Sequence, residues 1–152
     1  MTGPVNVDRV AWKEWKHSDE IRVRFKPLHD EPDAHVGVCI QELSPGCSTR
    51  PAHYHLREEE HVYVLRGEMM VRLGQKQHQM REGDYVCFRA GDALEHCLIN
   101  PFDSPCEYLL WGERNPDDVI VYPDSNKVGV KAMDENYVRD PKGYWDGEGL
   151  DD

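Results

Sequence analysis

Residues 46–67 read GCSTRPAHYHLREEEHVYVLRG, and this stretch decides the fold. His53 and His55 are two positions apart, so on a strand both side chains leave the same face, with Cα atoms about 6.5–7 Å apart. Two imidazoles at that spacing can reach one ion at about 2.0–2.2 Å from each ring nitrogen. Glu60 opens a second strand-like run, EHVYVL, in which alternate residues share its face. The pattern predicts a metal site inside a β-barrel.

Short strand-like runs recur on both sides of this stretch, separated by turns rich in Gly and Pro. We expect strands at 21–25, 36–43, 60–65, 68–73, 77–80, 85–88, 95–100, 107–112, 119–122 and 127–131. No helical periodicity interrupts residues 21–112, which is typical of an all-β sandwich or barrel. In the N-terminal segment the spacing of Trp12 and Trp15 predicts a short helix that packs both rings against the barrel.

Composition excludes several classes of partner. The 152 residues favour a single domain, and 29 acidic against 18 basic residues give a net charge of -11. This field repels phosphate backbones and anionic membranes, so we expect no nucleic-acid and no membrane partner. No apolar run has the length of a membrane span, and the N-terminus lacks a signal core, so we expect a cytoplasmic protein. Five cysteines without a CxxC pair argue against a disulfide framework and a thiolate zinc site.

Turn clusters divide the chain into three parts. We expect a barrel core at 36–114, an N-terminal arm and edge strand at 1–35, and a C-terminal extension at 115–152. The extension would wrap the barrel or a neighbouring subunit. Open sheet edges need covering, so we expect a homodimer, and a monomeric mass by light scattering would contradict this.

The central stretch resembles the first motif of the cupin superfamily, G-x5-H-x-H-x3,4-E-x6-G. Gly46, His53, His55, Glu60 and Gly67 stand in its places, with six rather than five residues between Gly46 and His53.

Residues 83–100, GDYVCFRAGDALEHCLIN, are a looser counterpart of the second cupin motif, G-x5-P-x-G-x2-H-x3-N. Gly83, Gly91, His96 and Asn100 match, Arg89 replaces the proline, and four residues rather than two precede the histidine. The likeness covers residues 36–111. The C-terminal YPDSNK and YWDGE also resemble small bacterial cupins that carry the provisional label of sugar-phosphate isomerases.

The resemblance implies a double-stranded β-helix, or jelly-roll barrel, of six to eight strands. In it His53, His55, Glu60 and His96 would converge on one divalent transition metal. Imidazoles with one carboxylate suit Fe, Mn, Zn or Ni, and also Cu or Co, without choosing among them. Four protein ligands leave one or two positions open for a substrate oxygen or for dioxygen. No catalytic residue beyond these ligands is assigned, since Tyr, Glu and His residues are all candidates for a general base.

The residues around the motif have simpler interpretations. We expect Glu58 and Glu59 to form a solvated acidic bend, although a register slip by one residue would put Glu59 in place of Glu60. His61 should face away from the site, and Asn100 should make a structural hydrogen bond. Four histidines without partners at ligand spacing are expected at the surface: His17, His29, His35 and His78. Three arginines are either surface ion-pair partners or contacts for an anionic substrate: Arg50, Arg57 and Arg89.

Two classes of function remain. The first is a metal-dependent enzyme acting on a small polar metabolite. With Fe it would activate dioxygen for oxidative cleavage, whereas with Mn, Zn or Ni it would act as a Lewis acid in isomerisation, epimerisation or lyase chemistry. The second is a non-catalytic module that binds a small ligand as a sensor or keeps a metal for stability. The fold alone does not decide between them.

Overall fold

The computed structural model describes residues 3–29 and 31–149, which form an almost entirely β structure. The strands are β1 (Lys13–Lys16), β2 (Arg22–His29), β3 (Val36–Leu43), β4 (Tyr54–His55), β5 (Glu60–Arg66), β6 (Glu68–Leu73), β7 (Lys76–Arg81), β8 (Tyr85–Phe88), β9 (His96–Ile99), β10 (Cys106–Glu113), β11 (Val119–Tyr122), β12 (Lys127–Val130) and β13 (Glu135–Val138). Short 3-10 turns are η1 (Val7–Arg9), η2 (Pro123–Ser125) and η3 (Lys131–Met133). Within the described ranges no helix is long and apolar enough to cross a membrane.

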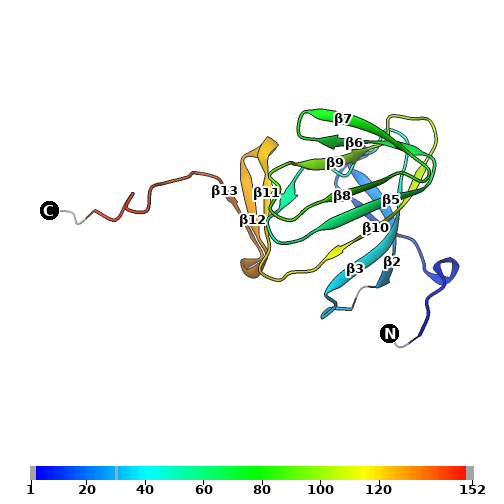
Figure 1. Ribbon diagram of the computed structural model, residues 1–152, viewed down its shortest axis with the longest axis horizontal. Helices are drawn as coiled ribbons and strands as arrows, with labels where there is room; N and C mark the ends of the chain where they lie inside the picture. Colours follow the sequence, from blue (N-terminus) through cyan, green and yellow to red (C-terminus); the bar gives the residue numbers. More distant parts are fainter. Residues whose placement is uncertain (1–2, 30, 150–152) are drawn as a thin grey trace.

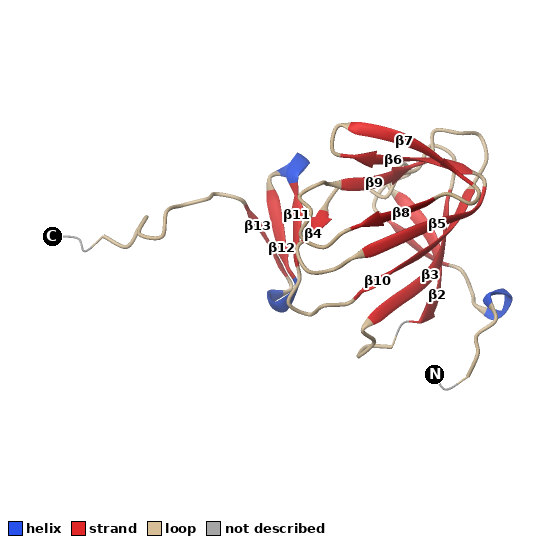
Figure 2. Ribbon diagram, viewed as in Figure 1, coloured by secondary structure: helices blue, strands red, loops and turns tan. Residues whose placement is uncertain are grey.

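The strands form a jelly-roll barrel (Figures 1 and 2). A six-stranded sheet runs in the order β1-β2-β3-β10-β5-β8, and a three-stranded sheet in the order β7-β6-β9. A four-stranded sheet, β13-β12-β11-β4, lies at one end of the barrel (Figure 1). Beyond β13 the described part of the C-terminal segment extends away from the barrel in the same view. The predicted all-β jelly roll is confirmed.

Period-2 patterning fixes which side chains enter the barrel. On β5 the side chains of Val62 and Val64 are fully buried, whereas Tyr63 and Leu65 are exposed. The buried residues pack with Leu43 and others of the neighbouring strands in one apolar core. Glu60 stands in the same alternation as the two valines, so it faces the interior as predicted.

The predicted helix around Trp12 and Trp15 is wrong. Lys13–Lys16 is strand β1, which pairs antiparallel with β2 and so covers an otherwise open sheet edge. The two rings part: Trp12 lies near the cations of Arg24 and Lys26, at 4.8 and 4.9 Å, whereas Trp15 borders the interior cavity. A spacing of three in a short polar segment is too weak a signal against the hairpin that β1 forms with β2, in which Lys16 pairs with Arg22.

Gly67 joins β5 to β6 at a point where no other residue fits well. Its φ is +82°, and a Cβ built there would lie 2.6 Å from the carbonyl oxygen of Pro105. The closing glycine of the first motif is therefore required both by its backbone conformation and by close backbone approach.

Asn100 makes the structural hydrogen bonds predicted for it. The side chain is fully buried, and its Nδ2 donates to the carbonyl oxygens of Leu43 and Ser104, each at 2.8 Å. Its Oδ1 accepts from the amide of Phe102 at 3.0 Å. One amide side chain thus fixes the loop between β9 and β10 to the end of β3.

We expect Asn100→Ala to lower the free energy of unfolding by about 2–4 kcal/mol, because buried backbone groups lose their partners. Urea denaturation measures the change. Gln77→Ala, at an exposed position on β7, is the control and should stay within about 0.5 kcal/mol of the wild type. A loss for Asn100→Ala no larger than the control would contradict the assignment.

Candidate metal centre

The backbone itself joins the two histidine motifs. The amide of His53 donates to the carbonyl of His96 at 3.1 Å, and the amide of His96 donates to the carbonyl of His53 at 2.8 Å. His55 lies next to this bridge on β4, which pairs with β11 through His55 and Ile120. The imidazoles are therefore carried by paired backbone rather than by mobile loops.

Glu60 enters the same space from β5. Its cross-strand neighbour is Gly112 on β10. A Cβ at Gly112 would lie 2.8 Å from the carbonyl oxygen of Glu59 and 3.1 Å from Cγ of Glu60. The absence of a side chain at this position leaves room for the carboxylate.

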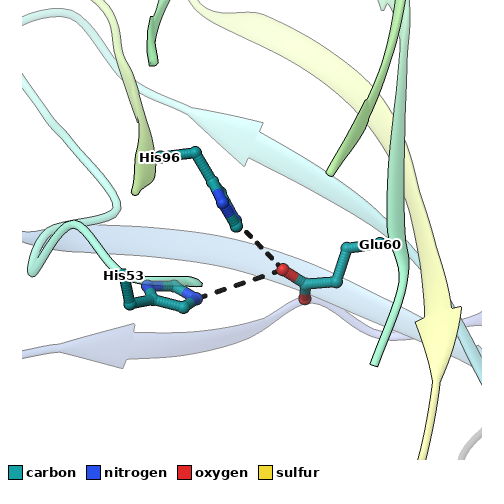
Figure 3. Close-up of side chains that lie close together, drawn as sticks. All are labelled: His53, Glu60 and His96. Atoms are coloured by element: carbon teal, nitrogen blue, oxygen red, sulfur yellow. Dashed lines mark hydrogen bonds and ion pairs between the residues drawn. The ribbon is translucent and has the colours of Figure 1, made fainter. Parts of the chain in front are cut away.

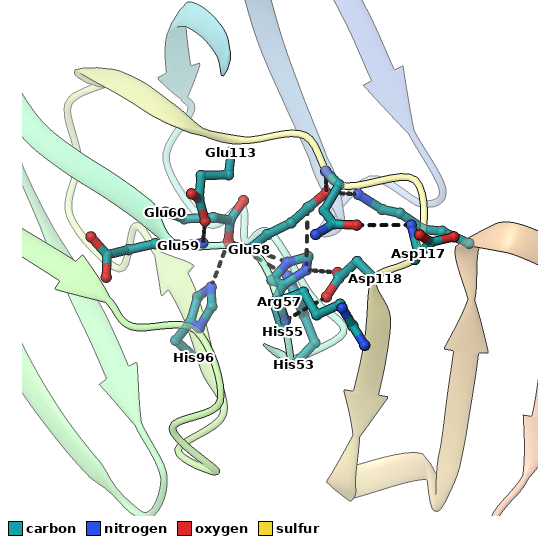
Figure 4. A network of polar contacts seen from close by, with 12 residues as sticks. His53, His55, Arg57, Glu58, Glu59, Glu60, His96, Glu113, Asp117 and Asp118 are labelled. Atoms are coloured by element: carbon teal, nitrogen blue, oxygen red, sulfur yellow. Dashed lines mark hydrogen bonds and ion pairs between the residues drawn. The ribbon is translucent and has the colours of Figure 1, made fainter. Parts of the chain in front are cut away.

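All four residues predicted as metal ligands come together (Figures 3 and 4). The Oε2 atom of Glu60 lies 3.1 Å from Nε2 of His96, 3.5 Å from Nε2 of His55 and 4.0 Å from Nε2 of His53. Atoms that each lie about 2.1 Å from one ion are separated by roughly 3.0 Å at a right angle and about 4.2 Å when opposite. The distances from this oxygen fit a shared ion. One donor atom each of His53, Glu60 and His96 lies within 4.8 Å of the other two, whereas His55 belongs to a second such group with Glu58 and Asp118.

Contacts at Nδ1 of His53 and His55 orient Nε2 of each ring towards Glu60. Nδ1 of His53 lies 3.0 Å from the carbonyl oxygen of Pro51, and Nδ1 of His55 lies 2.6 Å from Oδ2 of Asp118. A ring nitrogen that faces such an acceptor carries the proton, which leaves a lone pair on Nε2. Nε2 of His55 is buried and has no hydrogen-bond partner. An ion in the centre would satisfy it.

His96 is held differently from the other two histidines. Its ring stacks on Phe88, with centroids 3.6 Å apart and an interplanar angle of 3°. Its Nδ1 is buried without a hydrogen-bond partner. Apart from the contact of Nε2 with Glu60, packing sets the orientation of this ring.

A buried polar network lies behind His55 (Figure 4). Asp118, which is fully buried, accepts from the amide of Arg57 at 2.8 Å as well as facing His55. Glu58 is only 5% exposed, accepts from the amide of Asn115 at 2.6 Å and forms an ion pair with Lys131. The prediction that Glu58 is solvated is wrong, because residues far along the chain cover it.

Charges in the centre depend on one another. Burial alone lowers the pKa of His55, but Glu60 and Asp118 attract its proton and raise the pKa to about 9. Burial raises the pKa of Glu60, but His55 and His96 outweigh it and hold that pKa far below its usual range. Burial and the neighbouring His96 lower the pKa of His53 to about 4. In the metal-free protein near neutral pH, His55 is therefore protonated on both ring nitrogens, and its charge lies between the carboxylates of Glu60 and Asp118. A metal cation would take the place of the proton on Nε2.

Other predicted side chains lie outside the centre. Glu59 and His61 face each other, with 3.3 Å between Oε1 and Nε2, and His61 points away from Glu60 as predicted. The four remaining histidines are exposed, and His29 among them borders the cavity: His17, His29, His35 and His78. The larger cavity beside the centre is lined by Arg114, and the second cavity by no arginine, whereas Arg89 lines a small pocket of about 60 Å³ that also touches His96.

The centre opens into a cavity of about 490 Å³ that contacts His53, His55 and Glu60. A second space of about 210 Å³ reaches His96, and Trp15 borders both. One wall is apolar, with Val23 and Leu110. Around the larger cavity lie the polar or charged side chains of His29, Gln41, Glu58, Glu113, Arg114 and Lys131. The site can therefore hold a small polar molecule beside the four ligands.

Sequence reasoning missed Asp118, Lys131 and Trp15. Asp118 sits in a turn cluster at 115–118 that reads as a domain boundary, and nothing in its spacing to His55 signals a contact. Its place is set by the pairing of β11 with β4. Such a long-range pairing leaves no local pattern.

Comparison with known proteins identifies the class. Residues 39–112 match the family model described as Cupin domain. This chain therefore belongs to the cupin superfamily. Among proteins with curated descriptions, none matches the sequence.

Solved structures give closer likenesses. A sugar phosphate isomerase of the cupin superfamily from Silicibacter pomeroyi is 26% identical, with a TM-score of 0.73, covering 83% of this chain and 85% of that one. A protein provisionally described as a sugar phosphate isomerase from Acidithiobacillus ferrooxidans is 25% identical, with a TM-score of 0.80 and coverage of 90% and 93%. A predicted oxalate decarboxylase from Thermotoga maritima, 19% identical with a TM-score of 0.63 and coverage of 73% and 98%, shares the fold.

We expect the metal-free protein to lose stability as the pH rises. The folded pKa of His55 is raised above its unfolded value near 6.5, so its contribution is complete below pH 6.5 and disappears as the pH passes about 9. The free energy of unfolding of chelator-treated protein should fall by up to about 3 kcal/mol over this range. Urea denaturation at several pH values measures it.

His55→Gln is the matched variant for this experiment, because it keeps a polar side chain that does not titrate. Its loss of stability between pH 6.5 and 9 should be clearly smaller than that of the wild type. Equal slopes for the two proteins would show that His55 is not the group responsible.

Proposed function

We propose that this chain is a metal-dependent cupin enzyme that isomerises a small anionic metabolite, with a sugar phosphate as the first substrate class to test. The observation that carries the proposal is the convergence of His53, His55 and His96 on one oxygen of Glu60 beside a cavity. These four residues would hold one divalent ion, with Mn, Zn, Ni and Fe all compatible. When bound, the ion supplies a Lewis acid that polarises a substrate oxygen.

The cavity supports a negatively charged substrate despite the acidic chain. Arg114 and Lys131 both line it, on the side where Glu58 and Glu113 also lie. Trp15 and the apolar wall would exclude water from the bound molecule. A phosphate that contacts Arg114 would leave the remainder of a small sugar to reach towards the centre.

Isomerisation also needs a group that moves a proton. Outside the four ligands, the cavity presents Glu113 and His29, while Glu58 is engaged by Lys131. Glu113 is exposed, and one of its oxygens accepts from the amide of Glu59 at 3.1 Å. These two residues are the first to test as the base.

Two solved structures favour isomerisation over oxidation. The two likenesses at 25–26% identity, each spanning most of both chains, are described as sugar phosphate isomerases. Dioxygen chemistry at an iron centre remains the competing reaction for the same ligand set.

We expect protein purified without chelator to contain Mn, Zn, Ni or Fe by elemental analysis. His53→Ala/His55→Ala should contain close to one equivalent less than the wild type, because two of the four donors are gone, whereas the surface control His78→Ala should match the wild type. The loaded wild type should interconvert aldose and ketose phosphates under strict anaerobiosis, followed by NMR in D₂O.

The outcomes separate the alternatives. No metal in the wild type, even after reconstitution with each ion, would overturn the enzyme proposal. Turnover that requires oxygen would replace the isomerase with an oxygenase. A loaded protein that binds sugar phosphates without converting them would support the non-catalytic binding module.

A further inference from the structure

A second group of ligand-type side chains lies on the outer face of the six-stranded sheet. Cross-strand pairing puts His61 of β5 opposite Cys87 of β8, and Glu59 immediately precedes β5. One donor atom from each of these three residues lies within 4.8 Å of the other two. Nε2 of His61 is 3.3 Å from Oε1 of Glu59. An imidazole, a carboxylate and a thiol therefore meet at one point, outside the barrel.

The ring of His61 is already oriented. It stacks on Trp111 of β10, with centroids 4.9 Å apart and an interplanar angle of 9°. Its Nδ1 lies 2.7 Å from the hydroxyl of Tyr85. When the hydroxyl accepts a hydrogen bond from Nδ1–H, His61 is in the tautomer that keeps a lone pair on Nε2, on the side of Glu59. A hydrogen bond on the far nitrogen is what orients a metal-binding histidine.

The donor set selects the kind of ion. Thiolate and imidazole suit zinc and its neighbours among the transition metals, whereas Mg²⁺ and Ca²⁺ prefer oxygen ligands alone. The side chains of His61 and Glu59 are 20% and 39% exposed, so an ion can enter and a water can fill a fourth position. The sequence argued against a thiolate site because no CxxC pair is present, but sheet register assembles this one from two strands.

We propose that Glu59, His61 and Cys87 form a second metal site, for Zn²⁺ or a similar transition-metal ion, separate from the inner centre. An ion there ties the edge strand β8 to β5. Phe88 follows Cys87 and stacks on His96, while Glu60 follows Glu59. The outer site thus braces the two strands that carry part of the inner centre. The proposal does not depend on the proposed isomerase activity.

Cobalt distinguishes the two sites, because the inner centre contains no sulfur ligand. Chelator-treated full-length protein is titrated with Co²⁺ under reducing conditions, and the near-ultraviolet absorption is followed. A thiolate-to-cobalt charge-transfer band should appear in the wild type. It should also appear in His53→Ala/His55→Ala, in which the inner ligands are disrupted.

Matched cysteine variants locate the sulfur. Cys87→Ser should abolish the band, whereas Cys39→Ser, at a cysteine that lines the inner cavity, should keep it. His61→Gln should weaken Co²⁺ binding at the band by about tenfold or more. Circular dichroism of the metal-free variants confirms that each is folded.

Two results would overturn the proposal. The first is a wild type without the band at any Co²⁺ concentration that saturates the inner centre. The second is a band that survives in folded Cys87→Ser and disappears in Cys39→Ser, which would place the thiolate in the inner cavity instead.

Discussion

The arrangement of the molecule depends on three imidazole nitrogens and one carboxylate oxygen that meet inside a barrel. Four such donors cannot lie close together in a partly buried space unless their charges are balanced. Without a metal, the balance is a proton on His55, held by Glu60 and Asp118. A metal ion would be held by the same oxygen and by the three imidazoles, once His55 has lost its Nε2 proton. The backbone bridge between His53 and His96 holds two of the three imidazoles beside this oxygen.

The C-terminal strands supply polar contacts that support this centre. β11 pairs with β4 and so brings Asp118, just before β11, against His55. η3, after β12, brings Lys131 against Glu58. Both acidic residues are buried and would be costly without these partners. The segment after residue 114, which the sequence predicts to be an extension, therefore supplies polar contacts around the four ligands. The cupin domain match at residues 39–112 ends before this segment.

Sequence patterns predicted most of the strands and all four residues of the inner cluster. β3, β6, β8 and β11 have the predicted bounds, because alternation and turn residues act locally. The motif spacing placed His96 beside His53 even though the loop before it is longer than the pattern. The burial of Glu58 and the role of Asp118 could not be predicted, because their partners are distant in sequence. β1 was missed for another reason: its hairpin with β2 has no alternating apolar pattern on the β1 side. Local periodicity does not predict which strand will pair with which sheet edge.

The period of two along β5 also explains why one short stretch serves two faces. Consecutive residues of a strand point to opposite sides, so Glu60 enters the barrel while Glu59 and His61 remain outside. The same alternation on β8 sends Phe88 inward against His96 and Cys87 outward against His61. Each inner contact therefore has an outer neighbour one residue away on the same pair of strands. Any force that holds β8 to β5 on the outside restrains the ring of His96 on the inside, since a sliding edge strand would move Phe88 with it.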